Sequence, residues 1–134
     1  MTGGNDRGLV RRGITRVTEL LDAGVNVLSS QDDVNDPYYP FGRPDQIEVG
    51  QYMAHVAKLT YPRQLETVFD MITVNAARAM RLERYGVEPG DRADLVLIDA
   101  GSVHEALREI PPRRLVFYGG KLVAESRLEV STYD

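Results

Sequence analysis

The stretch Val25-Asn-Val-Leu-Ser-Ser-Gln-Asp-Asp33 decides how the fold of this chain is interpreted. Its apolar start, residues 25–28, predicts a short buried strand, and the acidic pair Asp32-Asp33 follows closely. At the carboxyl end of such a strand, an α/β barrel presents metal ligands or proton-transfer groups to its substrate. Asp32 and Asp33 are therefore the first candidates for a functional site.

The residues before this stretch predict a helix. Gly24 stands where a left-handed C-terminal cap is usual, and helical spacing relates the apolar residues Val10, Ile14, Val17 and Leu21. We predict one amphipathic helix over about residues 11–23, because helix, glycine turn and apolar strand form the αβ unit of a parallel sheet. The polar, glycine-rich residues 1–8 predict a flexible start.

Helices are expected to dominate the middle of the chain. Residues 34–44 are rich in proline and aromatic side chains, which excludes regular structure but permits an ordered loop. A helix is then predicted over 45–61, with the stripe Ile47, Gly50, Ala54, Ala57 and Tyr61. Pro62 opens another helix, buried through Leu65, Val68, Phe69 and Ile72. Thr73 is a candidate N-cap for a short helix over 75–82.

A second architectural unit is expected after Gly86. Residues 93–98 have the β-branched, apolar character of a strand, and 102–110 can form a short helix. Residues 114–118 and 121–124 flank Gly119-Gly120 and predict a hairpin. Arg113 and Arg114 are expected to form a solvated strand edge rather than a phosphate site.

The composition describes a single globular domain of 134 residues with a net charge of −4. No Lys/Arg-rich run suggests nucleic acid or an anionic membrane as partner. The chain has no Cys, so it can form no disulfide or thiolate metal site. The start does not resemble a signal peptide, and no apolar run approaches the roughly 20 residues of a membrane span. We expect a cytoplasmic protein.

Two blocks of sequence resemble the carboxy-terminal part of cytosine deaminases, in the metal-dependent amidohydrolase superfamily. The first runs from Arg11-Arg-Gly-Ile-Thr-Arg-Val17 to Asp32-Asp-Val-Asn-Asp-Pro-Tyr-Tyr-Pro40. It is fairly specific to enzymes acting on triazine or pyrimidine rings. The second, which occurs widely in the superfamily, runs from Thr73-Val-Asn-Ala-Ala-Arg-Ala-Met-Arg-Leu82 to Gly90-Asp-Arg-Ala-Asp-Leu-Val-Leu-Ile-Asp99. The similarity covers about residues 9–125.

The resemblance implies an α/β fold: a carboxy-terminal fragment of a (β/α)8 barrel, mostly helical, followed by strands of a small β-sandwich. Residues 9–85 would be the end of the catalytic barrel, with its last helix-strand unit and following helices. Residues 86–134 would be part of the small β-sandwich domain.

The resemblance also implies site roles. Asp32 would ligate a divalent metal, usually iron or zinc, and accept the proton of the metal-bound water, whose pKa the metal lowers. Asp33 would help to orient the ring substrate or hold the site's hydrogen bonds. Tyr38 lies where cytosine deaminases have a tryptophan and would supply an aromatic wall. From the residues alone, acids and aromatics in such a loop are more often turn formers and packing anchors than site residues.

Most of the family's site is expected to be missing from this chain. The His-x-His motif, the other metal-binding histidines and the glutamate general acid belong to earlier barrel strands. The only histidines, His55 and His104, do not have metal-ligand spacing with Asp32. Because a catalytic metal ordinarily needs three or more protein ligands, we predict that the chain alone is inert and binds no metal.

Two functions remain open from the sequence. In the first, the chain is the carboxy-terminal segment of an enzyme that deaminates a cytosine-like or triazine-like ring by metal-activated water. In the second, it is a non-catalytic fragment whose exposed apolar helix faces drive self-association or bind a partner chain. A homo-oligomer or a missing amino-terminal half is the partner expected.

Overall fold

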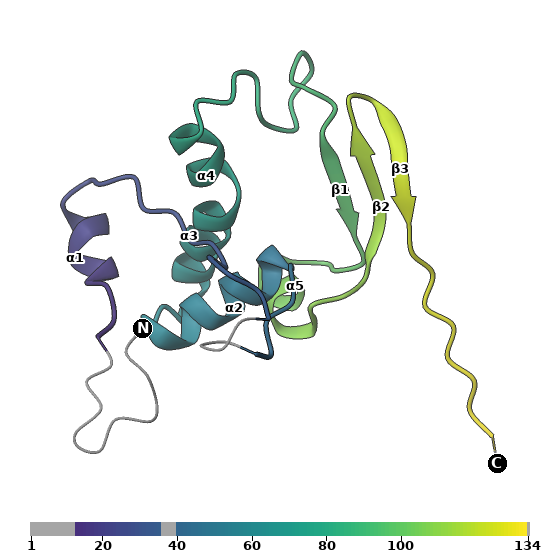
Figure 1. Cartoon of the computed structure of the whole chain (residues 1–134), viewed down its shortest axis with the longest axis horizontal. Helices are drawn as coiled ribbons and strands as arrows, with labels where there is room; N and C mark the ends of the chain where they lie inside the picture. The colour runs from purple at the N-terminus through teal and green to yellow at the C-terminus, as the bar shows by residue number, and fades with distance from the viewer. Residues whose placement is uncertain (1–12, 36–39, 134) are drawn as a thin grey trace.

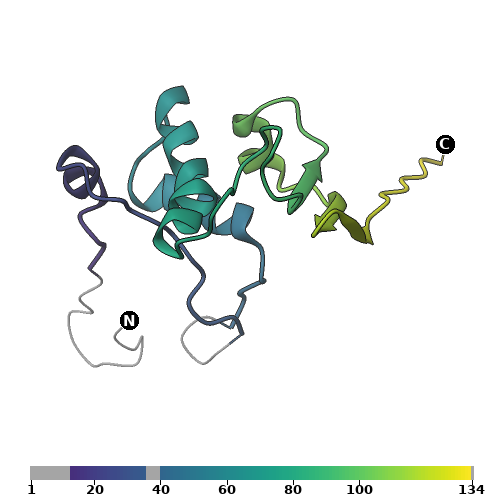
Figure 2. The ribbon, with the colours of Figure 1, turned by 90° about the horizontal axis from the view of Figure 1, so that it is seen from above.

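The computed structural model describes residues 13–35 and 40–133, which form a group of helices with a small antiparallel sheet at one end (Figure 1). Figure 2 confirms that α1 and the sheet lie at opposite ends. The helices are α1 (Val17–Asp22), α2 (Gln46–Val56), α3 (Pro62–Ile72), α4 (Val74–Ala79) and α5 (Val103–Glu109). Among the described helices, none is both long and apolar enough to cross a bilayer.

The sheet has three strands in the order β1-β2-β3, each antiparallel to the next. They are β1 (Leu95–Ile98), β2 (Arg113–Tyr118) and β3 (Lys121–Glu125), with α5 between the first two. Gly119 and Gly120 have φ angles of 56° and 76°, as the tight turn of a twisted hairpin requires. The predicted hairpin, the strand before it and the intervening helix are confirmed.

A capping side chain starts α2, and a proline starts α3. Asp45 accepts hydrogen bonds from the N–H groups of Ile47 (2.9 Å) and Glu48 (3.3 Å) at the start of α2. Pro62 occupies the first turn of α3, as predicted. Thr73 does hold the N-cap position of α4, but its hydroxyl donates to the Phe69 carbonyl (2.7 Å) instead of capping that helix.

Three helices end in the same way, with one residue in the left-handed region just past the C-cap. These residues are Gly24 (φ 74°), Lys58 (φ 57°) and Arg81 (φ 55°). After each, an N–H group donates back across the last turn: Val25 to Leu20, Leu59 to Ala54 and Leu82 to Ala77, at 2.9–3.0 Å. This is the Schellman arrangement, and the prediction for Gly24 is confirmed.

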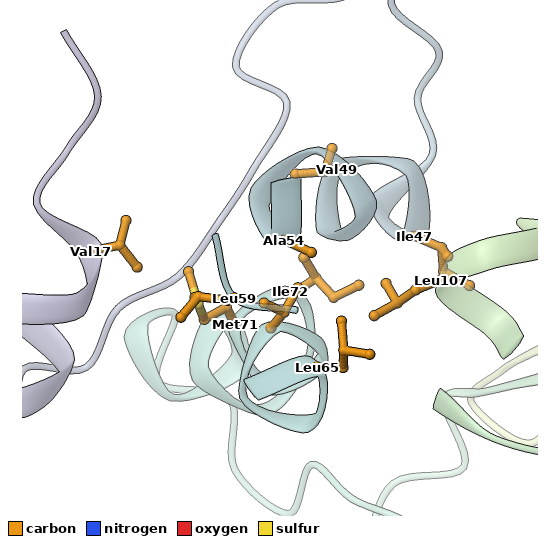
Figure 3. Close-up of a cluster of buried hydrophobic side chains, with 10 residues drawn as sticks. Val17, Ile47, Val49, Ala54, Leu59, Leu65, Met71, Ile72 and Leu107 are labelled. Atoms are coloured by element: carbon orange, nitrogen blue, oxygen red, sulfur yellow. The ribbon is translucent and has the colours of Figure 1, made fainter. Parts of the chain in front are cut away.

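The hydrophobic core lies between α2, α3 and α5 (Figure 3). Val68 and Met71 of α3 are fully buried, and Leu107 of α5 is 3% exposed. Gly50 lets α2 approach closely, since a Cβ there would stand 2.9 Å from Leu107 Cδ2 and 3.0 Å from Ile72 Cδ1. The cluster comprises Val17, Ile47, Val49, Ala54, Leu59, Leu65, Val68, Met71, Ile72 and Leu107.

Among the residues that the structure describes, one ion pair joins the helical group to the sheet, besides apolar packing. Arg113, the first residue of β2, forms an ion pair with Asp45, the N-cap of α2, and also donates to the Pro111 carbonyl (2.8 Å). Ile98 at the end of β1 and Ile110, the C-cap of α5, pack against the core. The prediction of a solvated edge is therefore wrong for Arg113, while Arg114 is exposed and pairs with Asp99 (3.2 Å).

The predicted buried strand at 25–28 is wrong. These residues pair with no strand, and Val25 and Leu28 are 47% and 42% exposed. A strand is stabilised by its neighbours in a sheet, and no described residues lie alongside this segment as a strand.

Three predicted helix boundaries also need correction. The short helix predicted over 75–82 is α4, which ends at Ala79. The first helix begins at Val17, because 13–16 are not helical; 11 and 12 lie outside the described residues. Tyr61, placed on the buried stripe of α2, is 73% exposed, since α2 ends at Val56 and Tyr61 precedes α3.

Candidate functional site

The acidic pair lies on the connection between α1 and α2, which Figure 1 shows crossing the helical group. Asp32 has a φ angle of 65° and Asn35 one of 59°, so the backbone twice enters the left-handed region that Asp and Asn tolerate better than most residues. The side chains of Asp32 and Asp33 are exposed and form no hydrogen bond or ion pair with other described residues. Within the described part of the chain, both carboxylates therefore face solvent.

Upstream of the pair, the connection is fastened to the end of α3. Ser29 is 7% exposed, and its N–H group donates to the Met71 carbonyl (3.1 Å). This bond fixes the backbone three residues before Asp32, although no strand is present there. The position from which Asp32 projects is therefore set by the most deeply buried helix of the molecule.

A second set of hydrogen bonds ties the connection to α4. Asn75 Nδ2 donates to the Val27 carbonyl (2.9 Å), and Asn26 Nδ2 donates to the Asn75 carbonyl (3.0 Å). Arg78 Nη1 donates to Asn26 Oδ1 (3.2 Å). The side-chain amides replace the strand pairing that was expected for this segment.

These contacts join the two blocks of sequence that carry the family resemblance. Asn26 belongs to the first block, whereas Asn75 and Arg78 belong to the second, about 50 positions later. The sequence reasoning assigned no role to any of the three residues. No periodic pattern in the sequence marks them, because their side chains join segments about 50 positions apart.

The described residues do not fit a metal ion. They contain no group of three or more His, Cys, Asp or Glu side chains placed to hold one. His55 on α2 and His104 on α5 are both exposed, and neither joins Asp32 in such a group. A carboxylate pair by itself offers fewer protein ligands than a catalytic metal requires. We derive no catalytic step through a metal from these residues.

Tyr38, the candidate aromatic wall, lies outside the described residues. Its neighbour in the same loop, Phe41, is 81% exposed. Asp45, which follows this loop, caps α2 and forms an ion pair with Arg113. Of the three predicted site residues, the structure therefore places Asp32 and Asp33 side by side.

The model of the Amidohydrolase family matches residues 7–124, most of the chain. The chain belongs to the amidohydrolase family. Amidohydrolases are generally metal-dependent enzymes. The family resemblance that was expected from two blocks of sequence is confirmed over residues 7–124.

Two curated relatives of this chain are named as an amidohydrolase and a deaminase. N-isopropylammelide isopropyl amidohydrolase of Pseudomonas sp. (strain ADP) is 30% identical over 116 residues, which cover 86% of this chain and 29% of the relative. Pterin deaminase of Rhizobium rhizogenes (strain K84) is 32% identical over 116 residues, 86% of this chain and 26% of the relative. The chain thus spans less than a third of either relative.

Solved structures of amidohydrolases show the same fold. 5-Methylcytosine deaminase from Klebsiella pneumoniae, liganded with 5-fluorocytosine, superposes with a TM-score of 0.85 at 33% identity. The match covers 96% of this chain and 32% of that enzyme. N-isopropylammelide isopropylaminohydrolase from Burkholderia multivorans gives a TM-score of 0.79 at 38% identity, over 84% of this chain and 29% of the enzyme.

Proposed function

We propose that this chain is the carboxy-terminal segment of an amidohydrolase that deaminates a cytosine-like or triazine-like ring. The observation that carries the proposal is the match of 96% of the chain to a deaminase whose structure holds 5-fluorocytosine. The relatives that act on N-isopropylammelide and pterin support the same reaction class, hydrolysis of a C–N bond on a ring. Residues 9–85 would form the end of the barrel and 86–134 part of the β-sandwich.

Within that enzyme, we assign one metal-ligating and catalytic carboxylate to this chain, Asp32. Its exposure, its lack of partners among the described residues and its fixed backbone support the assignment. Asp33 and Tyr38 would contact the ring substrate. The metal, iron or zinc, would take its remaining ligands from residues outside this chain, because the described residues hold no cluster that could bind it.

The first test measures metal binding by the chain alone. We expect no stoichiometric, high-affinity uptake of iron or zinc after dialysis, because a single carboxylate pair leaves a divalent ion mostly hydrated. Asp32→Ala and the control Asp22→Ala, an exposed acid on α1, should give the same negative result. Stoichiometric binding that Asp32→Ala abolishes and Asp22→Ala preserves would contradict the proposed inertness.

The second test supplies the missing part of the enzyme. The portion of Klebsiella pneumoniae 5-methylcytosine deaminase that this chain does not cover is mixed with the chain and with iron or zinc, and ammonia release from 5-fluorocytosine is measured. We expect activity that neither part has alone and that Asp32→Asn reduces by at least about 100-fold. Asp22→Asn is the matched control. A stable complex that releases no ammonia would count against the split-enzyme proposal.

A second function, self-association without catalysis, is favoured by the surface of the sheet rather than by the helices. Val96 and Leu97 of β1 and Leu122 and Val123 of β3 are 50–58% exposed, which leaves apolar side chains in solvent on both strands that flank β2. Exposed apolar side chains on both edge strands of a small sheet favour contact with another chain. A second copy of the chain is the partner proposed.

Sedimentation over a range of concentrations tests this alternative. We expect a dimer whose dissociation constant rises at least about tenfold in the Leu122→Lys variant, because burying an unpaired charge at the contact costs free energy. Leu128→Lys is the control, since Leu128 is 75% exposed in the segment that follows β3. A chain that stays monomeric at every concentration would eliminate self-association.

A further inference from the structure

An open hollow follows α4, and three arginines from two segments contribute to its lining. The hollow has a volume of about 430 Å³ and is lined by Arg81, Leu82, Glu83, Arg84 and Arg92. The Arg92 N–H group donates to the Arg84 carbonyl (2.8 Å), which holds the two segments together. The basic lining is therefore a product of the fold and not of a single basic run.

The charges of this lining are only partly neutralised. Arg92 forms an ion pair with Asp94 (2.9 Å), whereas Arg81 and Arg84 have no ion pair within the part of the chain that the structure describes. Glu83 also lines the hollow, without pairing with either arginine. With Glu83 in the lining and Asp94 paired to Arg92, the three arginines still leave a net positive charge, in a chain whose net charge is −4. Such a grouping attracts an anion.

The backbone offers further donors at the same place. Arg81 and Arg84 have φ angles of 55° and 51°, a left-handed conformation that costs a non-glycine residue roughly 1 kcal/mol or more. The N–H groups of Glu83 and Arg84 donate no hydrogen bond to any described residue. Successive unpaired N–H groups at left-handed turns form a concavity that binds anions.

We propose that this hollow binds a phosphoryl group, carried by inorganic phosphate or by a phosphate monoester. Guanidinium groups match the oxygens of a tetrahedral anion with paired N–H donors, and such charge-assisted hydrogen bonds are stronger than neutral ones. The free N–H groups of Glu83 and Arg84 add donors without further charge. The carboxylate of Glu83 repels the anion, so the hollow binds phosphate with modest affinity.

Amide NMR of the full chain tests the proposal, with inorganic phosphate and phenyl phosphate as probes and chloride to hold the ionic strength constant. We expect saturable shifts at the amides of residues 81–84 and 92 with both probes. Arg84→Gln should weaken binding about tenfold, because one charge-assisted contact is removed. Arg63→Gln is the matched control, since Arg63 is an exposed arginine without an ion pair among the described residues.

Glu83→Gln gives a test in the opposite direction. Removing a carboxylate that lines the hollow should tighten phosphate binding several-fold, while the amide spectrum away from residues 81–92 stays unchanged. Saturation by phenyl phosphate with similar affinity supports recognition of the phosphoryl group itself. Shifts that do not saturate, that chloride reproduces, or that Arg84→Gln leaves unaltered in a folded variant would overturn the site.

Discussion

At the scale of single residues, Asp45 connects more of the molecule than any predicted site residue does. Its carboxylate caps α2 through Ile47 and Glu48 and pairs with Arg113 of β2. We expect Asp45→Ala to lower the free energy of unfolding by about 2 kcal/mol, from the lost cap and the unpaired arginine. Urea denaturation followed by circular dichroism measures the change.

Two further variants separate the contributions of Asp45. Asp45→Asn keeps a good capping side chain but loses the ion pair, so it should cost less than Asp45→Ala. Asp70→Ala is the control, because Asp70 is exposed on α3 and its side chain has no partner among the described residues. An effect of Asp70→Ala as large as that of Asp45→Ala would show that the cap and the ion pair are not the cause.

Lys58 is the residue whose replacement should stabilise the protein. It occupies the left-handed position after α2 with a φ angle of 57°, where glycine meets no steric cost. We expect Lys58→Gly to raise the free energy of unfolding by about 0.5–1 kcal/mol, whereas Lys58→Ala keeps the strain and gives no gain. Thermal denaturation of the two variants provides the comparison, and equal stabilities would refute the role of φ.

At the scale of elements, α3 organises both the core and the candidate site. Met71 is fully buried, and its carbonyl accepts the hydrogen bond from Ser29 that fixes the segment before Asp32. We expect Met71→Ala to lower the free energy of unfolding by about 2–5 kcal/mol, because it leaves a cavity in packed surroundings. Met80→Ala supplies the same change at a side chain that is 69% exposed, and it should cost less than about 0.5 kcal/mol.

The sequence predicted those elements whose information is local. Pro62 at the start of α3, Ser102 before α5 and Gly119-Gly120 in the hairpin each act within a few residues, and each element is found as expected. The segment 25–28 was mistaken for a strand because apolar, β-branched residues do not specify their neighbours. Its actual partners, Asn75 and Arg78, lie about 50 positions away.

The candidate site, too, was predictable only where its information is local in the sequence. The acidic pair could be singled out from sequence because Asp32-Asp33 follows an apolar run, and the structure places both residues on an exposed connection. The hydrogen bonds that hold this connection join distant segments through side-chain amides, which leave no periodic pattern in a sequence. Residues such as Asn26 could therefore be identified only from the fold.

At the scale of the whole molecule, burial is distributed unequally between the helical group and the sheet. Val68 and Met71 of α3 are completely buried, whereas all five residues of β3 are exposed. Local opening needs little free energy where few apolar contacts are lost. We expect the amides of β3 to exchange with deuterium at least about 100-fold faster than those of α3, a difference of roughly 2.7 kcal/mol in opening free energy.

The ion pair between Arg113 and Asp45 should control how independently the sheet opens. Arg113→Gln removes the charged contact between β2 and the start of α2, so exchange in the sheet should accelerate several-fold while the amides of α3 change little. Arg114→Gln is the control, because Arg114 and Asp99 form an exposed pair that contributes little to stability. If α3 and β3 instead exchange at one rate in every variant, the chain opens as a single cooperative unit and the ion pair stabilises the whole of it.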